Sequence, residues 1–467
     1  MSDYQSAREI LAQLRDGTLT ATALMERTLA RIASVNPDLN AIVALRPAEE
    51  LMEEARKADA MRAAHVPLGP LHGLPMAVKD LANVRGIAST QGSPLLKDFV
   101  PTEDELFVAR LRAAGAILIG KTNTPEFGLG SHTFNPVYGA TRNPFDGSRT
   151  CGGSSGGAAV ALAADMVALA DGSDMMGSLR NPAGWNNVYG FRPTWGWVPS
   201  EPKGDLFLHP LSTLGPMARS PEDIALLLDV MAGPDARQPL ASGGMPVVPL
   251  PEPGPMRIGW LGDWGGAFPM EEGVLETCAA TLKVFEDLGH SVEAVAPPFP
   301  AEKIWESWIT LRSFAVAAGL RVFEDRREHL KDTAIWELER GLAMTAQQVQ
   351  EASDLRSDWQ RAATRLFQSY DALILPTAQC WPFPVEIDYP REIAGVQMDT
   401  YHRWMQVVLP VSLLGLPCLA APAGFGQKGL PMGIQIFGAQ GQDQRLLALG
   451  QQYHGATMWP QKAPPPG

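Results

Sequence analysis

Residues 151–184 read CGGSSGGAAVALAADMVALADGSDMMGSLRNPAG, in which Ser154 and Ser178 each follow a glycine-rich turn. Between the two turns, the small apolar residues of 154–166 predict a closely packed helix, and VALADGSD (167–174) predicts a strand. No histidine lies between the two serines. A serine nucleophile in this stretch would therefore need a base from another part of the chain.

Strand and helix patterns alternate on both sides of this stretch. LPMAVKD (74–80) and AILIGKTN (116–123) predict buried strands, and TEDELFVARLRAAG (102–115) has the acidic start and glycine end of a helix. Residues 302–370 are mainly helical in pattern, with further strand patterns at 256–263, 291–295, 372–377 and 433–439. This alternation predicts an α/β fold with a mixed, largely parallel sheet covered by helices on both faces.

The composition is that of a globular protein, since 45% of the 467 residues are hydrophobic and 19% are charged. The net charge of −13 argues against nucleic acid and anionic membranes as partners. Residues 406–427 carry no charge, but Pro and Gly interrupt them repeatedly, which predicts buried strands and turns rather than a membrane span. The four cysteines are far apart and the first ten residues lack an apolar run, so reduced thiols, no signal peptide and a cytoplasmic location are expected.

Two residue types are considered as the base for a serine nucleophile, histidine and lysine. Neither serine stands in the G-x-S-x-G turn of α/β-hydrolases, and the eight histidines lie outside any motif typical of catalysis, although one distant in sequence is an alternative. A lysine also activates serine if burial or nearby positive charge keeps it neutral. Lys79, which ends the apolar run LPMAV, is the candidate, and a solvated Lys79 paired with Asp80 is the competing interpretation.

Six motifs occur in a fixed order along the chain. They are GPLHGLPMAVKD (69–80), KTNTPEFGLGS (121–131), YGATRNPFD (138–146), GGSSGG (152–157), GSDMMGSLRNPA (172–183) and YGFRPT (189–194). Together they closely resemble the amidase signature family. The likeness extends to the helical start and to later blocks such as LILPT (373–377), so it covers most of the chain and is weakest over 232–370.

The resemblance implies the family's fold and a catalytic triad of Ser178, Ser154 and Lys79. Ser178 would attack the carbonyl carbon, and its proton would pass through Ser154 to Lys79. The same relay would then serve hydrolysis of the acyl-enzyme by water. The resemblance also implies a cis peptide bond between Gly153 and Ser154. No metal or organic cofactor is expected, because neither a GxxxxGK[ST] nor an HExxH motif occurs.

The turn before Ser178 is expected to supply the oxyanion hole. Its donors would be the backbone N–H groups of Met175, Met176, Gly177 and Ser178. Met176 stands where the family commonly has glycine, so the backbone there is expected to tolerate a side chain, and two thioethers make the turn more apolar. The flanking Asp174 and Arg180 are expected to support this turn by hydrogen bonds.

DMMGSLRNPAGWNN (174–187) resembles a branch with 6-aminohexanoate cyclic dimer hydrolases and urethanase-type carbamate hydrolases. This implies a serine hydrolase that cleaves C–N bonds of small or oligomeric, apolar or aryl non-peptide amides. Parts of 200–215, 300–340 and 376–405 are expected to line the substrate site, since pockets are mainly apolar and often built from variable segments. Cys151 and Cys380 are expected to be packed hydrophobes near this region rather than catalytic groups.

Three alternatives stay open at this point. The same triad could serve a carbamate or aryl ester hydrolase. The chain could instead be one component of an amidotransferase that passes ammonia to a partner active on tRNA, against which the DMMGS turn and the tryptophan-rich middle argue. A non-catalytic binding module is the third alternative, and retention of Lys79, Ser154 and Ser178 argues against it.

The resemblance also predicts the organisation of the chain. Residues 1–467 are expected to form a single amidase domain. Its parts would be an N-terminal helical region (1–62), the signature core (70–220), a variable and partly helical region (232–370) and the C-terminal part of the core (371–467). A small-molecule amide or carbamate is the expected partner, and a homodimer is compatible with the family, although no interface is identifiable in the sequence.

Overall fold

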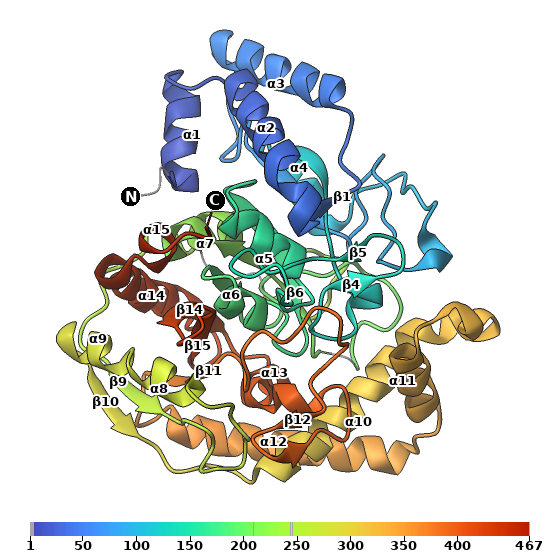
Figure 1. Cartoon of the computed structure of the whole chain (residues 1–467), viewed down its shortest axis with the longest axis vertical. Coiled ribbons are helices and arrows are strands. Elements are labelled where there is room, and N and C mark those ends of the chain that lie inside the picture. The colour runs from blue at the N-terminus through green and yellow to red at the C-terminus, as the bar shows by residue number, and fades with distance from the viewer. Residues whose placement is uncertain (1–3, 209, 243, 245, 467) are drawn as a thin grey trace.

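A computed structural model describes residues 4–208, 210–242, 244 and 246–466 of the chain. Three helices form its N-terminal end, at the top of Figure 1: α1 (Ala7–Asp16), α2 (Ala21–Leu39) and α3 (Ala48–Ala63). Helix α1 begins where the Ser6 hydroxyl accepts a hydrogen bond from Glu9 N–H, and it ends at Gly17 with φ of +86°. These helices confirm the predicted helical pattern of the described N-terminal residues.

A small sheet lies beside these helices and carries the predicted strand 74–80. Its three strands, in spatial order, are β1 (Ile42–Val43), β3 (Ile117–Thr122) and β2 (Pro75–Lys79). Helix α4 (Leu106–Ala113) connects β2 to β3, and these two strands are parallel. All five residues of β2 are buried, which explains the uninterrupted apolar run that precedes Lys79.

The large sheet has eight strands. In spatial order they are β10 (Ser291–Ala294), β9 (Arg257–Trp260), β11 (Ala372–Pro376), β15 (Pro431–Phe437), β14 (Cys418–Phe425), β7 (Tyr189–Arg192), β8 (Thr213–Ala218) and β6 (Leu169–Asp174). Two further short pairs are β4 (Phe134–Asn135) with β5 (Gly139–Ala140) and β12 (Glu392–Ile393) with β13 (Val396–Gln397).

The large sheet is mixed, as predicted, but the expectation that it is largely parallel is wrong. Only β10–β9 and β9–β11 are parallel pairs, and the other neighbouring pairs are antiparallel. Strands β14 and β15 are joined by the short connection 426–430, which can only form a hairpin. The alternation of strand and helix patterns does not reveal such hairpins, because it indicates the type of each element and not which strands pair.

Helices cover both faces of the large sheet, as the sequence predicts. The remaining helices are α5 (Gly156–Ala163), α6 (Asn181–Trp185), α7 (Pro221–Met231), α8 (Val274–Ala279), α9 (Leu282–Asp287), α10 (Ala301–Leu320), α11 (Asp332–Leu342), α12 (Ala346–Leu366), α13 (Leu409–Leu414), α14 (Asp443–Thr457) and α15 (Trp459–Lys462). Leu419 of β14 packs on Gly450 of α14, whereas Gly190, the partner of Ala420, packs on Ala183 of α6. Since successive strand residues point to opposite faces, α14 and α6 lie on opposite sides.

Helices α10, α11 and α12 form a layer at the lower end of the molecule in Figure 1. Helix α10 contacts α11, α12 and α13, so this layer is attached to the C-terminal part of the chain. The described ranges also contain the short 3₁₀ segments η1 (Pro94–Leu96), η2 (Glu126–Gly128), η3 (Arg321–His329) and η4 (Arg403–Val408). Segment 302–370 is therefore mainly helical, as predicted.

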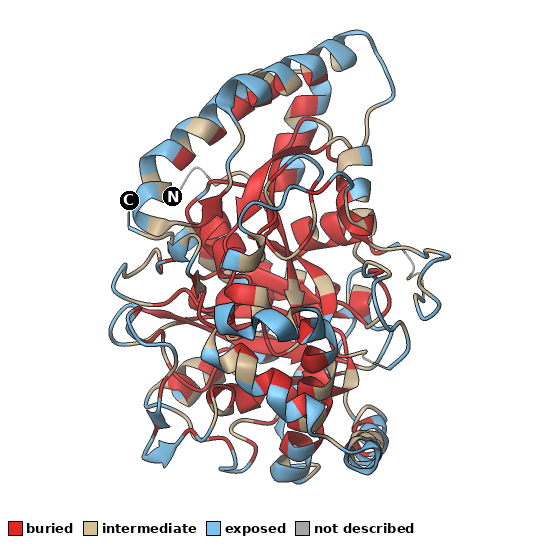
Figure 2. Cartoon of the chain, turned by 90° about the vertical axis from the view of Figure 1, so that its right-hand side faces the viewer, coloured by how far each residue is buried: buried red, intermediate tan, exposed pale blue. Residues whose placement is uncertain are grey.

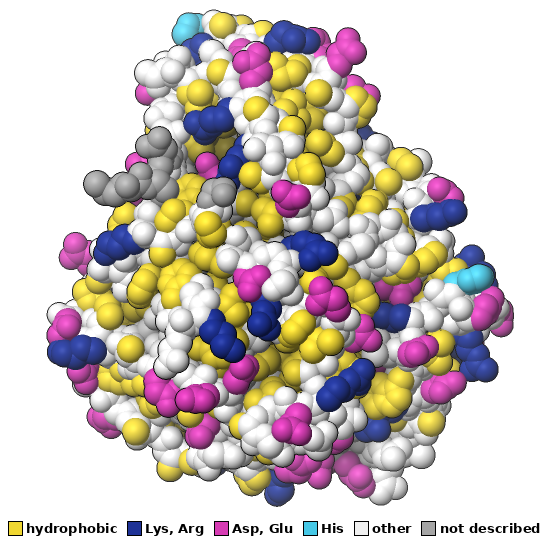
Figure 3. Space-filling model, viewed as in Figure 1, with side chains coloured by type: hydrophobic (Ala, Val, Ile, Leu, Met, Phe, Trp, Pro, Cys, Tyr) yellow, Lys and Arg dark blue, Asp and Glu magenta, His cyan; other side chains and the backbone are white. Residues whose placement is uncertain are grey.

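Burial follows this arrangement. Figure 2 shows the strands buried through the middle of the molecule, with the exposed residues on the outer sides of the peripheral helices. Figure 3 shows acidic and basic side chains intermixed on one face, with hydrophobic patches between them. Residues 406–427 form η4, α13 and β14 with turns, and among the described residues no helix has the length and apolar character needed to cross a membrane.

Candidate active site

Three chain segments bring the candidate triad together. Lys79 is the last residue of β2, Ser154 lies just before α5, and Ser178 lies in the turn after β6. Strand β2 contacts β6, and α5 contacts both strands. Every residue of α5 is buried, and a side chain at Gly157 would overlap the backbone of Asn123, which explains the small residues of this helix.

The Lys79 amine is surrounded by hydroxyl groups. Its Nζ lies 2.8 Å from Ser154 Oγ, 2.8 Å from Ser155 Oγ and 3.0 Å from Ser173 Oγ. Sequence reasoning singled out Ser154 and missed the other two. Both lie inside motifs that the sequence offers, Ser155 in GGSSGG and Ser173 in GSDMMGSLRNPA, so their place in these motifs is the signal that could have identified them. The Asp171 carboxylate accepts from the Lys79 backbone N–H at 3.1 Å, on the side of the sheet where the amine lies.

Burial lowers the pKa of the Lys79 amine to about 7, against the opposing effects of Asp171 and Asp174. Lys79 is only 2% exposed, so the competing interpretation of a solvated lysine is wrong. Asp80 instead bonds Thr90 and lies 3.4 Å from Lys121 Nζ, in a buried ion pair. The Lys79 amine can therefore exchange a proton near neutral pH.

The two candidate serines face a common space. Ser154 and Ser178 both line the same cavity, and the Ser155 N–H donates to the Ser178 carbonyl at 3.3 Å, which ties the two turns together. No direct hydrogen bond joins Ser154 Oγ and Ser178 Oγ in this arrangement of the described side chains. The peptide bond between Gly153 and Ser154 is cis, as the sequence resemblance implies.

The turn after β6 is held by a buried ion pair. Arg180 Nε lies 2.9 Å from Asp174 Oδ2, and Arg180 Nη2 lies 3.0 Å from Asp174 Oδ1, which confirms the predicted support of the turn by these two residues. Burial would raise the pKa of Asp174, but Arg180 and Arg192 lower it to about 2. The carboxylate therefore stays charged and fixes the turn over the whole physiological pH range.

Asp174 also accepts a hydrogen bond from one of the expected oxyanion donors. Gly177 N–H donates to Asp174 Oδ1 at 2.9 Å, so one of the four expected oxyanion donors already has an acceptor. Within the described part of the chain, the N–H groups of Met175, Met176 and Ser178 have no such acceptor. Gly177 has φ of +79°, whereas Met176 lies outside the left-handed region, so a side chain at position 176 is compatible with the turn.

The shared cavity has a volume of about 580 Å³ and a mainly apolar lining. Its wall includes Leu81, Phe127, Leu129, Met175, Met176, Val316, Leu320, Val322, Phe323 and Met405. Lys203, Gly204, Ser212, Arg312 and His402 also line it, so all three predicted variable segments contribute, with position 209 outside the described residues. None of the described lining residues is a tryptophan, and neither Cys151 nor Cys380 is among them.

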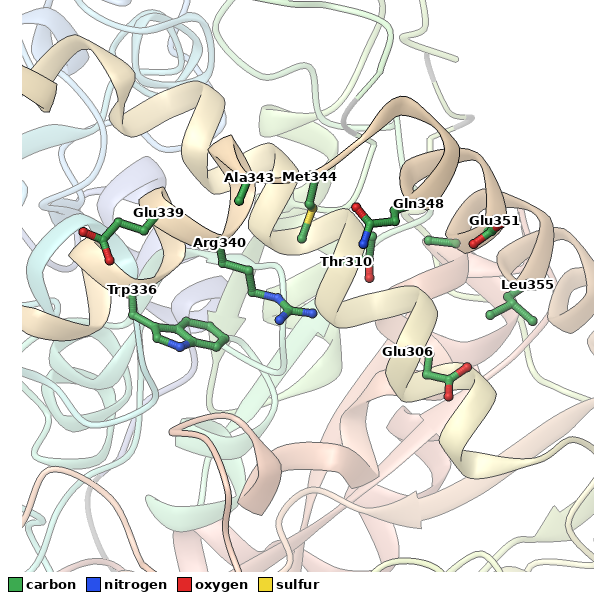
Figure 4. A pocket seen from close by; sticks show the side chains of 11 residues that line it. Glu306, Thr310, Trp336, Glu339, Arg340, Ala343, Met344, Gln348, Glu351 and Leu355 are labelled. Carbon is green, nitrogen blue, oxygen red and sulfur yellow. The ribbon is translucent and has the colours of Figure 1, made fainter.

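A second cavity of about 560 Å³ lies between α10, α11 and α12. Figure 4 shows its labelled side chains, among them Trp336, Arg340 and Glu351, on three neighbouring helices. It contains none of the candidate triad residues. Among the described residues, no group of three or more His, Cys, Asp or Glu side chains could hold a metal ion. The Lys79–Ser154–Ser178 cavity is therefore the candidate active site.

Comparison with known proteins gives a consistent result. The chain matches the Amidase family over residues 23–447. It is 33% identical to an acylamidase of Rhodococcus erythropolis, with 99% of this chain and 97% of the relative covered. It is 36% identical to a glutamyl-tRNA(Gln) amidotransferase subunit of Thermus thermophilus, with 97% of each chain covered.

Two solved structures show the same architecture. A bacterial aryl acylamidase of the amidase signature family superposes with a TM-score of 0.91 at 28% identity, covering 98% of this chain and 97% of the other. A substrate complex of 6-aminohexanoate cyclic dimer hydrolase superposes with a TM-score of 0.84 at 27% identity, covering 98% of both chains. The similarity thus spans the weakly matching segment 232–370 as well as the signature motifs.

Proposed function

The chain belongs to the amidase family and hydrolyses amides, and from this premise we propose that it cleaves small apolar or aryl carboxylic amides through an acyl-enzyme on Ser178. The observation that carries the proposal is a buried Lys79 amine, 2.8 Å from Ser154 Oγ, beside the cavity that Ser178 lines. A neutral amine in this position is a suitable base for a serine relay.

In the proposed reaction, Ser178 Oγ forms a bond to the carbonyl carbon and its proton moves through Ser154 to Lys79. This transfer requires Ser178 Oγ to come within hydrogen-bond distance of Ser154 Oγ when substrate is bound. The proton then returns through Ser154 to the leaving nitrogen as the C–N bond breaks. Water hydrolyses the acyl-enzyme by the same route.

The oxyanion of each tetrahedral intermediate would accept hydrogen bonds from the backbone of the turn. Met175, Met176 and Ser178 supply the candidate N–H donors, since Gly177 N–H is already bonded to Asp174. Loss of one such donor costs about 10²–10³ in rate in other acyl-transfer enzymes. The buried Asp174–Arg180 pair would keep these donors aligned before substrate arrives.

The mainly apolar cavity supports an apolar acyl or aryl group as substrate, and its volume lies within the range of small-molecule sites. Carbamates are the principal alternative substrates, because they present a similar carbonyl to the same nucleophile. An aryl ester has a better leaving group, so ester cleavage alone would not distinguish these candidates. Comparing the turnover of amide, carbamate and ester forms of one aryl scaffold would distinguish them.

The test is to follow turnover of these three substrates together with the intact mass of the protein. The wild type is expected to cleave the amide and to gain the mass of the acyl group, and Ser178→Ala is expected to lose both properties. Ser212→Ala is the matched control, since Ser212 lines the same cavity away from the Lys79 contacts. Equal turnover by Ser178→Ala and the wild type would refute the proposed nucleophile.

A role within an amidotransferase is the second candidate, and the 36% identity to the amidotransferase relative over 97% of both chains favours it. Glutamine, however, is small and zwitterionic, and the cavity is lined mainly by apolar side chains. Release of ammonia from glutamine, together with co-purification of a stable partner protein, would support this candidate. Cleavage of aryl amides by the isolated chain without glutaminase activity would support the stand-alone amidase.

Location and assembly belong to the same proposal. The four cysteines are free and buried, which is compatible with the reduced thiols of a cytoplasmic protein. We infer that the isolated chain binds a small-molecule amide or carbamate as its partner. Chromatography with light-scattering detection would decide between a monomer and the homodimer that the family allows.

A further inference from the structure

Arg312 on α10 brings a buried guanidinium to the wall of the active-site cavity. Its Nε donates to Glu337 Oε1 at 2.6 Å and its Nη2 donates to the Tyr401 hydroxyl at 3.1 Å. Its Nη1, in contrast, has Met175 Sδ, at 3.2 Å, as its one hydrogen-bond partner among the described residues, and the guanidinium lies 5.2 Å from the centre of the Trp308 ring. A thioether is a weak acceptor, so this donor is available to a stronger acceptor in the cavity.

His402 lines the same cavity and offers a hydrogen-bond acceptor. Its Nε2 lies 2.9 Å from Glu337 Oε1, and since an ionised carboxylate only accepts, Nε2 carries the hydrogen. Burial lowers the pKa of His402 to about 4, against the opposing effect of Glu337, so the ring is neutral. Its Nδ1 is then a bare acceptor, and this buried atom has no hydrogen-bond partner among the described residues.

Glu337 holds these two side chains next to one another, because both donate to the same carboxylate oxygen. The carboxylate also neutralises the guanidinium charge, and none of the described cavity-lining residues is Asp or Glu. Both side chains are almost fully buried beside the cavity, and together they hold one N–H donor and one nitrogen acceptor with no closer partner than the Met175 thioether. That combination is complementary to a neutral group with one acceptor and one N–H.

We propose that Arg312 and His402 form a recognition point for a second secondary amide or carbamate group of the substrate, apart from the bond that is cleaved. The carbonyl oxygen of this second group accepts from Arg312 Nη1 in place of Met175 Sδ, and its N–H donates to His402 Nδ1. A carboxylate lacks the N–H for His402, and an ammonium lacks the acceptor for Arg312 Nη1. This inference rests on the proposed function, and it identifies the preferred substrates as diamides, dicarbamates or short oligomers.

The test measures binding, so it does not depend on turnover. Ser178→Ala protein is titrated calorimetrically with aryl amides whose acyl chain carries, at a series of spacer lengths, a methylene, a secondary amide, its N-methyl derivative or an ester. At the best spacer, the secondary amide is expected to bind about tenfold more tightly than the methylene compound. The N-methyl amide and the ester keep the acceptor and lose the N–H, so they are expected to lose most of this gain.

Arg312→Lys in the same background preserves the positive charge opposite Glu337 but removes the planar donor set. It is expected to reduce the affinity ratio between the secondary amide and the methylene compound from about tenfold to about one. Equal affinities across the series in unmutated Arg312 protein, or no binding of any compound, would overturn the inference. Turnover of the plain aryl amide by the wild type separately tests the proposed function, so the two failures are distinguishable.

Discussion

The Lys79 amine lies among three hydroxyl groups. Among the described residues, no carboxylate lies within ion-pair distance of it. Burial without a contacting counter-ion disfavours the ammonium form, and the positive end of the α5 dipole lies close to the same point. Asp171 and Asp174 oppose this effect from a greater distance. The balance leaves the pKa of Lys79 at about 7, where an amine can both accept and return a proton.

The pKa of Lys79 determines how turnover is expected to depend on pH. Below its pKa of about 7 the Lys79 amine is protonated and cannot accept the proton of Ser178, so kcat/KM for an aryl amide should fall about tenfold per pH unit from pH 7 to pH 5. Above pH 8 this limb should level off. Lys79→Ala should lower activity by about 10³ or more and abolish the limb. A profile that stays flat between pH 5 and 7 in the wild type would argue that another group is the base.

Two serines at equal distance from the Lys79 amine are expected to differ in their importance for turnover. Ser154 and Ser155 both place Oγ 2.8 Å from Lys79 Nζ, but only Ser154 lines the cavity. Ser154→Ala should therefore lower kcat by about 10²–10³, because the proposed relay to Ser178 would be lost. Ser155→Ala should cost about tenfold or less, since it removes one hydrogen bond to the amine. Steady-state kinetics of both variants decides, and equal losses would show that Ser154 only positions Lys79.

Several buried hydrogen bonds hold the turn between β6 and α6. Asp174 receives N–H groups from Gly177 and Leu179 and pairs with Arg180, whose Nη1 in turn donates to the Val408 carbonyl. The turn is thereby tied to η4, an element far away in sequence. A small displacement of this turn would move the proposed nucleophile Ser178 and the candidate oxyanion donors together.

The third prediction uses Gly177, which has φ of +79° and would place a Cβ 3.0 Å from Val408 Cγ1. Gly177→Ala should lower the free energy of unfolding by about 1–2 kcal/mol through the left-handed conformation and should lower kcat about 10²-fold through displacement of the turn. Gly289→Ala is the matched control, since Gly289 has φ of +90° and open space around it.

Urea denaturation should show a similar loss of stability in both glycine variants, and kinetics should show a loss only in Gly177→Ala. An unchanged kcat in Gly177→Ala would indicate that the turn accommodates the methyl group without moving Ser178. If kcat falls instead, the replacement Val408→Ala in the Gly177→Ala background should restore part of the rate, because it removes the contact with the new methyl group.

At the scale of the whole molecule, the sequence predicts element types well and strand pairing poorly. The apolar run that ends at Lys79 and the small-residue run 154–166 predict a buried strand and a closely packed helix, because burial on both sides leaves a local pattern. The antiparallel majority of the large sheet leaves no such pattern, since pairing depends on which strands meet in space. The local patterns therefore predict a more parallel sheet than the structure has.

Some residues of the candidate site are recognisable in the sequence and others are not. Lys79 and the two serines of the glycine-rich turns are recognisable because they lie inside contiguous motifs. Arg312 and His402 lie in the segments that resemble the family least or lie outside its motifs, and only the packing of α10 and α11 against the chain near η4 brings both to Glu337. Contacts that form across such distances in sequence have no local signal.

The last prediction concerns the helical layer that closes the cavity. Gly319 lies near the end of α10, lines the cavity and has no atom within 4 Å of the position of a Cβ. Gly319→Leu should narrow the cavity without a clash, so kcat/KM for a bulky aryl amide should fall about tenfold, while that for a small acetanilide should change less than about threefold. Gly455→Leu is the matched control, because Gly455 is an exposed glycine of α14 with similarly open surroundings. Both replacements should raise the free energy of unfolding by about 0.5–1 kcal/mol, since leucine favours a helix over glycine. Unchanged selectivity in Gly319→Leu would mean that the bulky aryl group does not extend toward Gly319.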